Sequence, residues 1–167
     1  KPCILLFIPQ IAVSIYTILD RVMIGIFSSV IEVGYYDQSQ KIVKLALTFV
    51  TTFGTIMLPR IANMYSKGDN NTLKKYIEDS FEILMMLSIP LMFGLLAIAD
   101  NFVYWFLGTQ FLAVSKLIKI VSPIIVIISC SNVLGLQYLI PTGRNKEFTI
   151  SITIGAIVNL LINLTLI

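Results

Sequence analysis

The sequence reads ILMMLSIPLMFGLLAIA from residue 83 to residue 99, a stretch without a charged side chain. A helix needs about 20 mostly apolar residues to cross the hydrocarbon core of a bilayer. We therefore expect a transmembrane helix over residues 77–99, nearly all apolar and facing lipid. A strand is the poorer alternative, because lipid offers no hydrogen-bond partners to an open sheet edge.

Similar apolar stretches occur four more times among the 167 residues, and 57% of all residues are hydrophobic. They predict further transmembrane helices over residues 3–27, 39–65, 115–138 and 147–167. Only 13% of residues are charged, against about 25% in an ordinary soluble domain. The mean hydropathy of +0.90 agrees. The expected fold class is an all-α, multi-pass integral membrane protein. Because both ends of the sequence lie within apolar stretches, we interpret the chain as an internal piece of a longer protein.

The expected helix boundaries rest on polar and turn-forming residues. Gly34 marks the first loop, Asp100 closes the third helix, and residues 141–143 form a tight turn. Residues 67–82 are predicted to lie along the membrane surface, with Thr72 as a helix cap. Proline kinks are expected at the four prolines within the helices. These are Pro9, Pro59, Pro90 and Pro123.

Several classes of function lack their usual residues. The net charge of +3 is too small to indicate nucleic-acid binding. The chain contains no histidine, no phosphate-binding Gly-Lys-Ser/Thr loop and no close pair of carboxylates. Cys3 and Cys130 lie in apolar stretches, which predicts buried thiols rather than a disulfide framework. The sequence therefore predicts no enzyme, no cofactor and no metal site.

Lysine and arginine are distributed unequally between alternate loops. Four of them, or five with Arg21, belong to one side of the predicted bundle, and seven belong to the other. The seven are Lys1, Arg60, Lys67, Lys74, Lys75, Arg144 and Lys146. Because cytoplasmic loops carry the excess of positive charge, we expect the side with seven to be cytoplasmic.

Polar residues follow a helical spacing in the first two predicted helices, so each set shares one face of its helix. In the first helix they are Gln10, Ser14, Thr17 and Arg21, with Asp20 at the edge. In the second helix they are Asp37, Lys41, Lys44, Thr48, Thr51 and Thr55, opposite Val43, Ala46, Val50, Phe53 and Met57. We call these two sets the first and second polar stripes.

The stripes allow two interpretations. They could line a water-filled cavity whose cations gather toward one membrane face, because charges at membrane depth usually face a cavity or a partner. Alternatively, Ser and Thr join packed helices while Lys and Arg reach the interface. Asp20 would pair with Lys41 or Lys44, or serve ion coupling. Arg60 is either an interface anchor or a gate contact.

Two later helices carry small polar residues at regular spacing, which is typical of close helix packing. The predicted fourth helix has Ser115, Ser122 and Ser129, with Asn132 nearby. The predicted fifth helix has Ser151, Gly155, Asn159 and Asn163.

Four stretches resemble one family of membrane transporters. They are IPQIAVSIYTILDRVMIG at residues 8–25, VGYYDQSQKI at 33–42, TIMLPRIA at 55–62 and QYLIPTGRNKEFTISI at 137–152. Together they resemble the Wzx-type oligosaccharide-repeat-unit flippases of the multidrug/oligosaccharidyl-lipid/polysaccharide (MOP) exporter superfamily. The resemblance covers nearly the whole chain in the same order.

The resemblance implies a MATE-like transporter of two six-helix lobes in the bacterial cytoplasmic membrane. This chain would supply five helices of the second lobe, and the N-terminal lobe would be its partner. The family moves undecaprenyl-pyrophosphate-linked oligosaccharide across the membrane by alternating access, for capsule, O-antigen or exopolysaccharide. By position, Arg21, Lys41 and Lys44 match its cationic cavity lining, and Arg60 is a further phosphate contact. Glycosyltransferases and a polymerase are implied partners.

Three alternatives remain at this point. A cation-coupled multidrug exporter would show an acidic, aromatic cavity, which the basic stripes disfavour. A lipid II flippase of the same superfamily is a second alternative. A membrane scaffold without transport activity would need no polar cavity lining.

Overall fold

The computed structural model describes the backbone of residues 2–166 and the side chains of residues 11–166, except those of residues 12, 16, 164 and 166. Every regular element within this range is a helix. The chain divides into two compact units. One contains the residues up to Gly34 and those from Gly143 onward, and the other contains Tyr35–Thr142.

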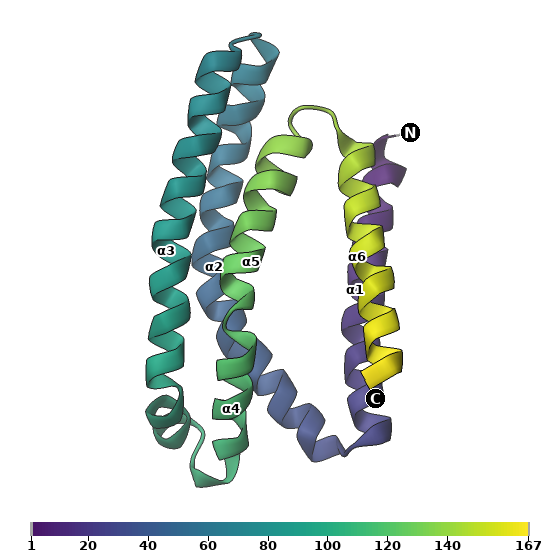
Figure 1. The fold of residues 1–167 in the computed structure, drawn as a ribbon, viewed down its shortest axis with the longest axis vertical. Coiled ribbons are helices and arrows are strands. Elements are labelled where there is room, and N and C mark those ends of the chain that lie inside the picture. Colours follow the sequence, from purple (N-terminus) through teal and green to yellow (C-terminus); the bar gives the residue numbers. More distant parts are fainter. Residues whose placement is uncertain (1, 167) are drawn as a thin grey trace. The chain divides into compact units, whose positions relative to one another are not determined.

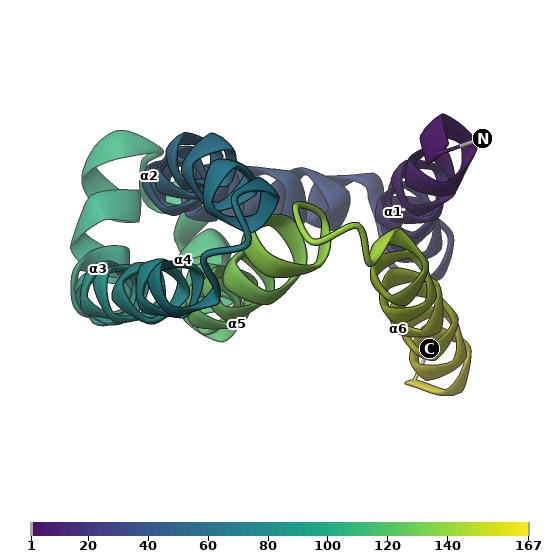
Figure 2. The same cartoon turned by 90° about the horizontal axis from the view of Figure 1, so that it is seen from above.

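The first unit is a pair of long helices, α1 (Pro2–Phe27) and α6 (Asn145–Leu166). They lie side by side in both views of the fold (Figures 1 and 2). Among the described side chains of this pair, Met23 is buried and the others are exposed or half-buried. The turn that leads into α6 contains Gly143 with φ of 77°, a backbone conformation that favours glycine. The predicted turn at residues 141–143 is confirmed.

The second unit is built on a helical hairpin of α2 (Val30–Ser66, from Tyr35 onward) and α3 (Asn70–Phe106). Gly68, with φ of 72°, lies in the turn between them. The chain returns along the hairpin through α4 (Leu112–Val121) and α5 (Ile124–Ser131), which Figure 1 shows in green. Two short segments complete the unit, the 3-10 turn η1 (Thr109–Phe111) and the π-helix η2 (Asn132–Leu139).

The core of the second unit is a cluster of apolar side chains from α2, α3, α5 and η2. Val43 and Val50 of α2 are fully buried and belong to one cluster with Leu84, Ile125 and Val133. Ala46 and Met57 are also buried, and Phe53 packs against the core. The predicted apolar face of the second helix is therefore confirmed as the face that builds the core.

The structure contains three helices long and apolar enough to cross a membrane within the described residues. They are α2, α3 and residues Asn145–Asn163 of α6. The bent pair of Thr109–Val121 and Ile124–Leu139 would add a fourth if it forms one span. The chain is thus a multi-pass membrane protein, and the count of five spans stays a prediction.

Several expected helix boundaries are wrong. Gly34 lies inside α2 rather than in a loop, and α3 continues past Asp100 to Phe106. The expected surface segment over residues 67–82 is not a separate element, because α3 is continuous from Asn70. A helix of 37 residues is about 55 Å long, well beyond a hydrocarbon core of about 30 Å. Its ends can therefore carry charges without ending the helix.

The predicted fourth helix is not a single rod. It breaks after Val121, and Ser122 and Pro123 separate α4 from α5, with a bend of 42° between the two halves. Proline causes such a break because it has no N–H to donate and its ring collides with the preceding turn. Pro59 and Pro90, in contrast, lie inside continuous helices.

The cap of α3 also differs from the expectation. Asp69, not Thr72, is the N-cap residue, and its carboxylate accepts a hydrogen bond of 3.1 Å from the backbone N–H of Thr72. An N-cap oxygen satisfies one of the backbone donors that the first turn of a helix leaves unpaired.

Candidate functional site

The second polar stripe occupies its own face of α2. Successive residues of a helix are rotated by about 100° around its axis. At this rotation the residues of α2 fall on three faces: a buried core face, a polar face and an exposed apolar face. Lys41, Lys44, Thr48 and Thr55 are exposed, and Thr51 is half-buried. The predicted separation of polar and buried residues on this helix is confirmed.

The threonine hydroxyls of this face donate to their own helix. Thr48 Oγ1 lies 2.9 Å from the carbonyl oxygen of Lys44, and Thr51 Oγ1 lies 3.1 Å from that of Leu47. Thr55 Oγ1 bonds the carbonyl of Thr52 at 2.8 Å. Each hydroxyl proton is therefore satisfied, while the oxygen lone pairs stay open to an outside donor. A row of threonine side chains with bonded hydroxyl protons can face lipid. The same oxygen atoms can also accept hydrogen bonds from the hydroxyl groups of a sugar.

The cations of the stripe are open to a ligand. Within the described part of the chain, neither Lys41 nor Lys44 forms an ion pair or a side-chain hydrogen bond. An unpaired ammonium group on an exposed helix face is a suitable contact for phosphate. Arg60 is exposed near the C-terminal end of α2, which leads into the turn before α3. That place fits an interface anchor, and the gate role predicted for Arg60 stays a prediction.

The first polar stripe borders the contact between α1 and α6. Ser14 is exposed, whereas Thr17 and Arg21 are half-buried. Thr17 Oγ1 donates to the carbonyl oxygen of Val13 at 2.9 Å. The side chain of Gln10 lies outside the described residues. The two stripes belong to different compact units, so the common cavity stays a prediction.

Asp20 has a partner on α6 that spacing could not identify. Its Oδ1 accepts a hydrogen bond of 2.6 Å from the amide of Asn163, which lies 3.3 Å from Asn159 Oδ1. Asn159 and Asn163 thus act at the helix contact, as the packing prediction expected. Ser151 and Gly155 do not, because both are exposed and nothing lies within 4 Å of a Cβ added at Gly155. The pairing of Asp20 with Lys41 or Lys44 stays a prediction.

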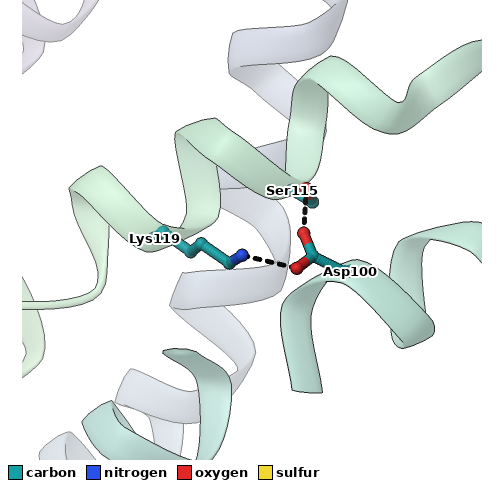
Figure 3. A network of polar contacts seen from close by, with 3 residues as sticks. All are labelled: Asp100, Ser115 and Lys119. Atoms are coloured by element: carbon teal, nitrogen blue, oxygen red, sulfur yellow. Dashed lines mark hydrogen bonds and ion pairs between the residues drawn. The ribbon is translucent and has the colours of Figure 1, made fainter. Parts of the chain in front are cut away.

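A charged cluster joins α3 to α4. Asp100 accepts a hydrogen bond from the Ser115 hydroxyl at 2.7 Å and pairs with the Lys119 ammonium at 2.5 Å (Figure 3). We expected Asp100 to end a helix and missed this role. A clue was available, because Ser115 and Lys119 are four residues apart and therefore share a face.

The small polar residues of the fourth predicted helix are buried, which confirms the packing interpretation. Ser122 and Ser129 are fully buried, and their hydroxyls bond backbone carbonyls one turn earlier. Asn132 is buried too, and its Oδ1 lies 3.3 Å from Gln137 Nε2 within the π-helix η2. The free thiol of Cys130 is half-buried, and the side chain of Cys3 lies outside the described residues.

The chain is similar in sequence to two proteins that are named as flippases. The probable low-salt glycan biosynthesis flippase Agl15 of Haloferax volcanii is 26% identical over 154 residues, which cover 91% of this chain and 32% of that protein. The lipid II flippase MurJ of Bacillus subtilis is 24% identical over 131 residues, covering 77% of this chain and 24% of that protein. The chain therefore spans about a third or less of these relatives.

No solved structure matches the chain at a significant level. The sequence model of the polysaccharide biosynthesis protein family matches residues 3–116, which are about two thirds of the chain. Together with its apolar helices and its polar stripes, this match shows that the chain belongs to the polysaccharide biosynthesis protein family.

Proposed function

We propose that the protein containing this chain translocates a lipid-linked oligosaccharide across the cytoplasmic membrane of a bacterium by alternating access. The cargo would be an undecaprenyl-pyrophosphate-linked repeat unit for capsule, O-antigen or exopolysaccharide. This chain would contribute helices of the second lobe, and the N-terminal lobe would form the other wall of the cavity. Glycosyltransferases and a polymerase would act before and after it.

The observation that carries this proposal is the division of α2 into opposite faces. Val43 and Val50 are fully buried, whereas Lys41, Lys44 and Thr48 are exposed on another side of the same helix. A helix that only faced lipid would gain nothing from unpaired ammonium groups at this position, because charges are costly in hydrocarbon. A water-filled cavity that receives an anionic headgroup removes that cost.

The chemistry of the two stripes matches the two polar parts of such a cargo. The ammonium groups of Lys41 and Lys44 and the guanidinium of Arg21 suit the charge of a pyrophosphate. The open lone pairs of Thr48, Thr51 and Thr55 suit the hydroxyl groups of a sugar. Ser14, Thr17 and Gln10 would add similar groups from α1.

A lipid II flippase is the second candidate, and the similarity to the protein of that name from Bacillus subtilis favours it. Both candidate cargoes combine a polyprenyl pyrophosphate with sugars, so the cationic stripe serves either. They differ in the cellular defect that follows loss of the protein. Loss of surface polysaccharide alone supports the first candidate, and arrest of cell-wall synthesis supports the second.

The proposal is tested in the full-length protein with Lys44→Ala and Arg21→Ala. We expect each variant to reach the membrane at the normal level and to abolish surface polysaccharide, measured by gel profile of the extracted glycan. Lys67→Ala is the matched control, because Lys67 is exposed in the turn after α2 and lies outside both stripes. Normal polysaccharide in both stripe variants, at normal protein level, would contradict the proposal.

A further inference from the structure

The π-helix η2 changes which residue of this segment faces the core. η2 continues α5 toward the turn before α6 (Figure 1). Ile125, Ser129 and Asn132 are buried and follow one another at spacings of four and three residues, so they share one face of a helix. An α-helix would place Leu136, four residues after Asn132, next on that face. Instead, Gln137 is fully buried and Leu136 is only half-buried.

The wider turn of a π-helix accounts for this shift of one residue. Its backbone hydrogen bonds join residues that are five apart, as the N–H of Ile140 does with the carbonyl oxygen of Gly135 at 3.1 Å. Asn132 and Gln137 are also five residues apart, and Gln137 Nε2 donates to Asn132 Oδ1 at 3.3 Å. In an α-helix a separation of five residues corresponds to a rotation of about 140°, so the two side chains would not meet. The contact between them therefore requires the π form.

The π form and an α-helical form each leave one buried polar atom without a partner. In the π form, Gln137 Oε1 is buried and has no hydrogen-bond partner among the described residues. In an α-helical form, Leu136 would replace Gln137 on the core face, and Asn132 Oδ1 would lose its donor. An unsatisfied buried polar atom carries the full cost of its desolvation. The π form keeps a hydrogen bond and the α form buries an apolar side chain, so the sequence supports both registers.

We propose that η2 is a two-state element that exchanges Gln137 for Leu136 on the core face as it passes from the π form to an α-helix. The exchange accompanies the alternating access of the full-length protein, and only this assignment to the transport cycle rests on the proposed function. Asn132 transmits the exchange to α2, because it lies directly against Gly54. Since α2 carries the second polar stripe, a change in η2 reaches the residues that face the cargo.

Two register variants hold η2 in opposite forms. Gln137→Leu removes the unpartnered oxygen and buries an apolar side chain in the π register, so it favours the π form. The double variant, Leu136→Gln with Gln137→Leu, moves the amide to the position four residues after Asn132, where an α-helix brings the two side chains together. It keeps the amino-acid composition and favours the α form. Leu134→Gln is the matched control, because Leu134 is exposed and lies outside the exchanging pair.

The register of η2 is measured by double electron–electron resonance between spin labels at Asn71→Cys and Leu139→Cys in the purified full-length protein, otherwise free of cysteine. Asn71 is exposed at the start of α3, and Leu139 is the last residue of η2. A shift of one residue turns Leu139 by about 100° around the helix axis, so the two forms give different distances. We expect two populations in the unchanged protein and in Leu134→Gln. Gln137→Leu should retain one of them, and the double variant should retain the other.

Surface polysaccharide then reports whether the transport cycle needs the exchange. Both register variants should lower it at least about tenfold at normal protein level, because a helix confined to one state cannot alternate. Leu134→Gln should leave it normal. Thermal unfolding in detergent should show that neither register variant is less stable than the unchanged protein, which separates loss of the exchange from loss of the fold. If the double variant does not accumulate, Asn132→Leu replaces it, since this change removes the oxygen that requires Gln137 as its donor.

Two results would overturn the inference. One and the same distance population in the unchanged protein and in both register variants would mean that η2 has a single form. Normal polysaccharide in either register variant would show that the transport cycle does not need the exchange. The spin-label distances are measured without cargo. They therefore test the two forms of η2 even if Lys44→Ala and Arg21→Ala retain normal polysaccharide and contradict the proposed function.

Discussion

Asn132 of η2 occupies the space directly beside Gly54 of α2. A Cβ added at Gly54 would lie 2.0 Å from Asn132 Oδ1 and 2.8 Å from its Cγ. Asn132 is held in place because it is buried and its Oδ1 accepts from Gln137. The helix α2, which carries the second polar stripe, is thus in close contact with a π-helix at Gly54. A π-helix is an element that often marks functional sites.

Gly54→Ala should therefore destabilise the second unit. An added methyl group in a packed interior typically costs about 1–3 kcal/mol, because neighbours must shift. Thermal unfolding of the purified protein in detergent measures the effect, with Gly94→Ala as the control glycine that has open space around it. Adding Asn132→Ala to Gly54→Ala should recover part of the loss. Equal melting temperatures for the two single alanine variants would contradict the close contact.

The contact between Asp20 and Asn163 should stabilise the pairing of α1 with α6. Polar contacts between membrane helices are worth about 1 kcal/mol, so Asn163→Ala should lower the stability of the first unit by about that amount. A double-mutant cycle with Asp20→Ala, followed by unfolding in detergent, isolates the pairwise contribution. Thr165→Ala is a suitable control, since its hydroxyl bonds only the backbone of α6. Additive effects of the two changes would show that the pair contributes nothing.

The parts of this structure that spacing predicts are local. The core face of α2 follows from Val43, Val50 and Met57 recurring at helical intervals, and packing then fixes that face inward. Contacts between distant segments do not follow from spacing. Asp20 and Asn163 are 143 residues apart in sequence, and neither stretch contains a sequence signal that identifies the other as its partner. The lengths of α2 and α3 were missed because charges end an apolar stretch without ending a helix.

The sequence also did not predict the apolar groove between α2 and α3, which is lined by residues of α2 between Ile42 and Phe49 and of α3 between Ile83 and Phe102. Its residues, such as Leu45 and Met86, look like ordinary lipid-facing positions in each helix taken alone. Only the arrangement of α2 against α3 makes them two walls of one surface. The sequence does predict the neighbouring stripe, because Lys41 and Lys44 stand out chemically within an apolar stretch.

Asp69 should make the start of α3 sensitive to acid. A hydrogen bond from the Thr72 side chain, followed by one from its backbone N–H, holds the pKa of Asp69 below its ordinary value of 3.8. The ionised cap therefore contributes stability that is fully present above pH 3.8 and is lost as pH falls through the lowered pKa. Hydrogen exchange of the amides of residues 70–74 should accelerate, relative to the intrinsic rate, in that acid range. Asp69→Asn should retain a cap without this pH dependence.

The orientation predicted from positive charge is tested at Asn70. This residue is exposed at the start of α3, on the side with seven basic residues. Asn70→Cys, in a full-length protein otherwise free of cysteine, should resist a membrane-impermeant maleimide in intact cells and react after permeabilisation. Gln110→Cys, exposed in η1 at the opposite end of α3, should show the reverse pattern. Labelling of Asn70→Cys in intact cells would invert the topology.

Water should reach the polar face of α2 within the membrane but not its other two faces. Thr48→Cys in the full-length protein should react rapidly with a small charged thiosulfonate, because an aqueous cavity keeps the thiol ionisable. Leu45→Cys on the exposed apolar face and Val50→Cys in the core should react at least about tenfold more slowly, since hydrocarbon and packed side chains exclude the reagent. Equal, slow reaction at all three positions would mean that the threonine hydroxyls only bond their own helix. The second polar stripe would then lack the water-filled cavity on which the proposed translocation depends.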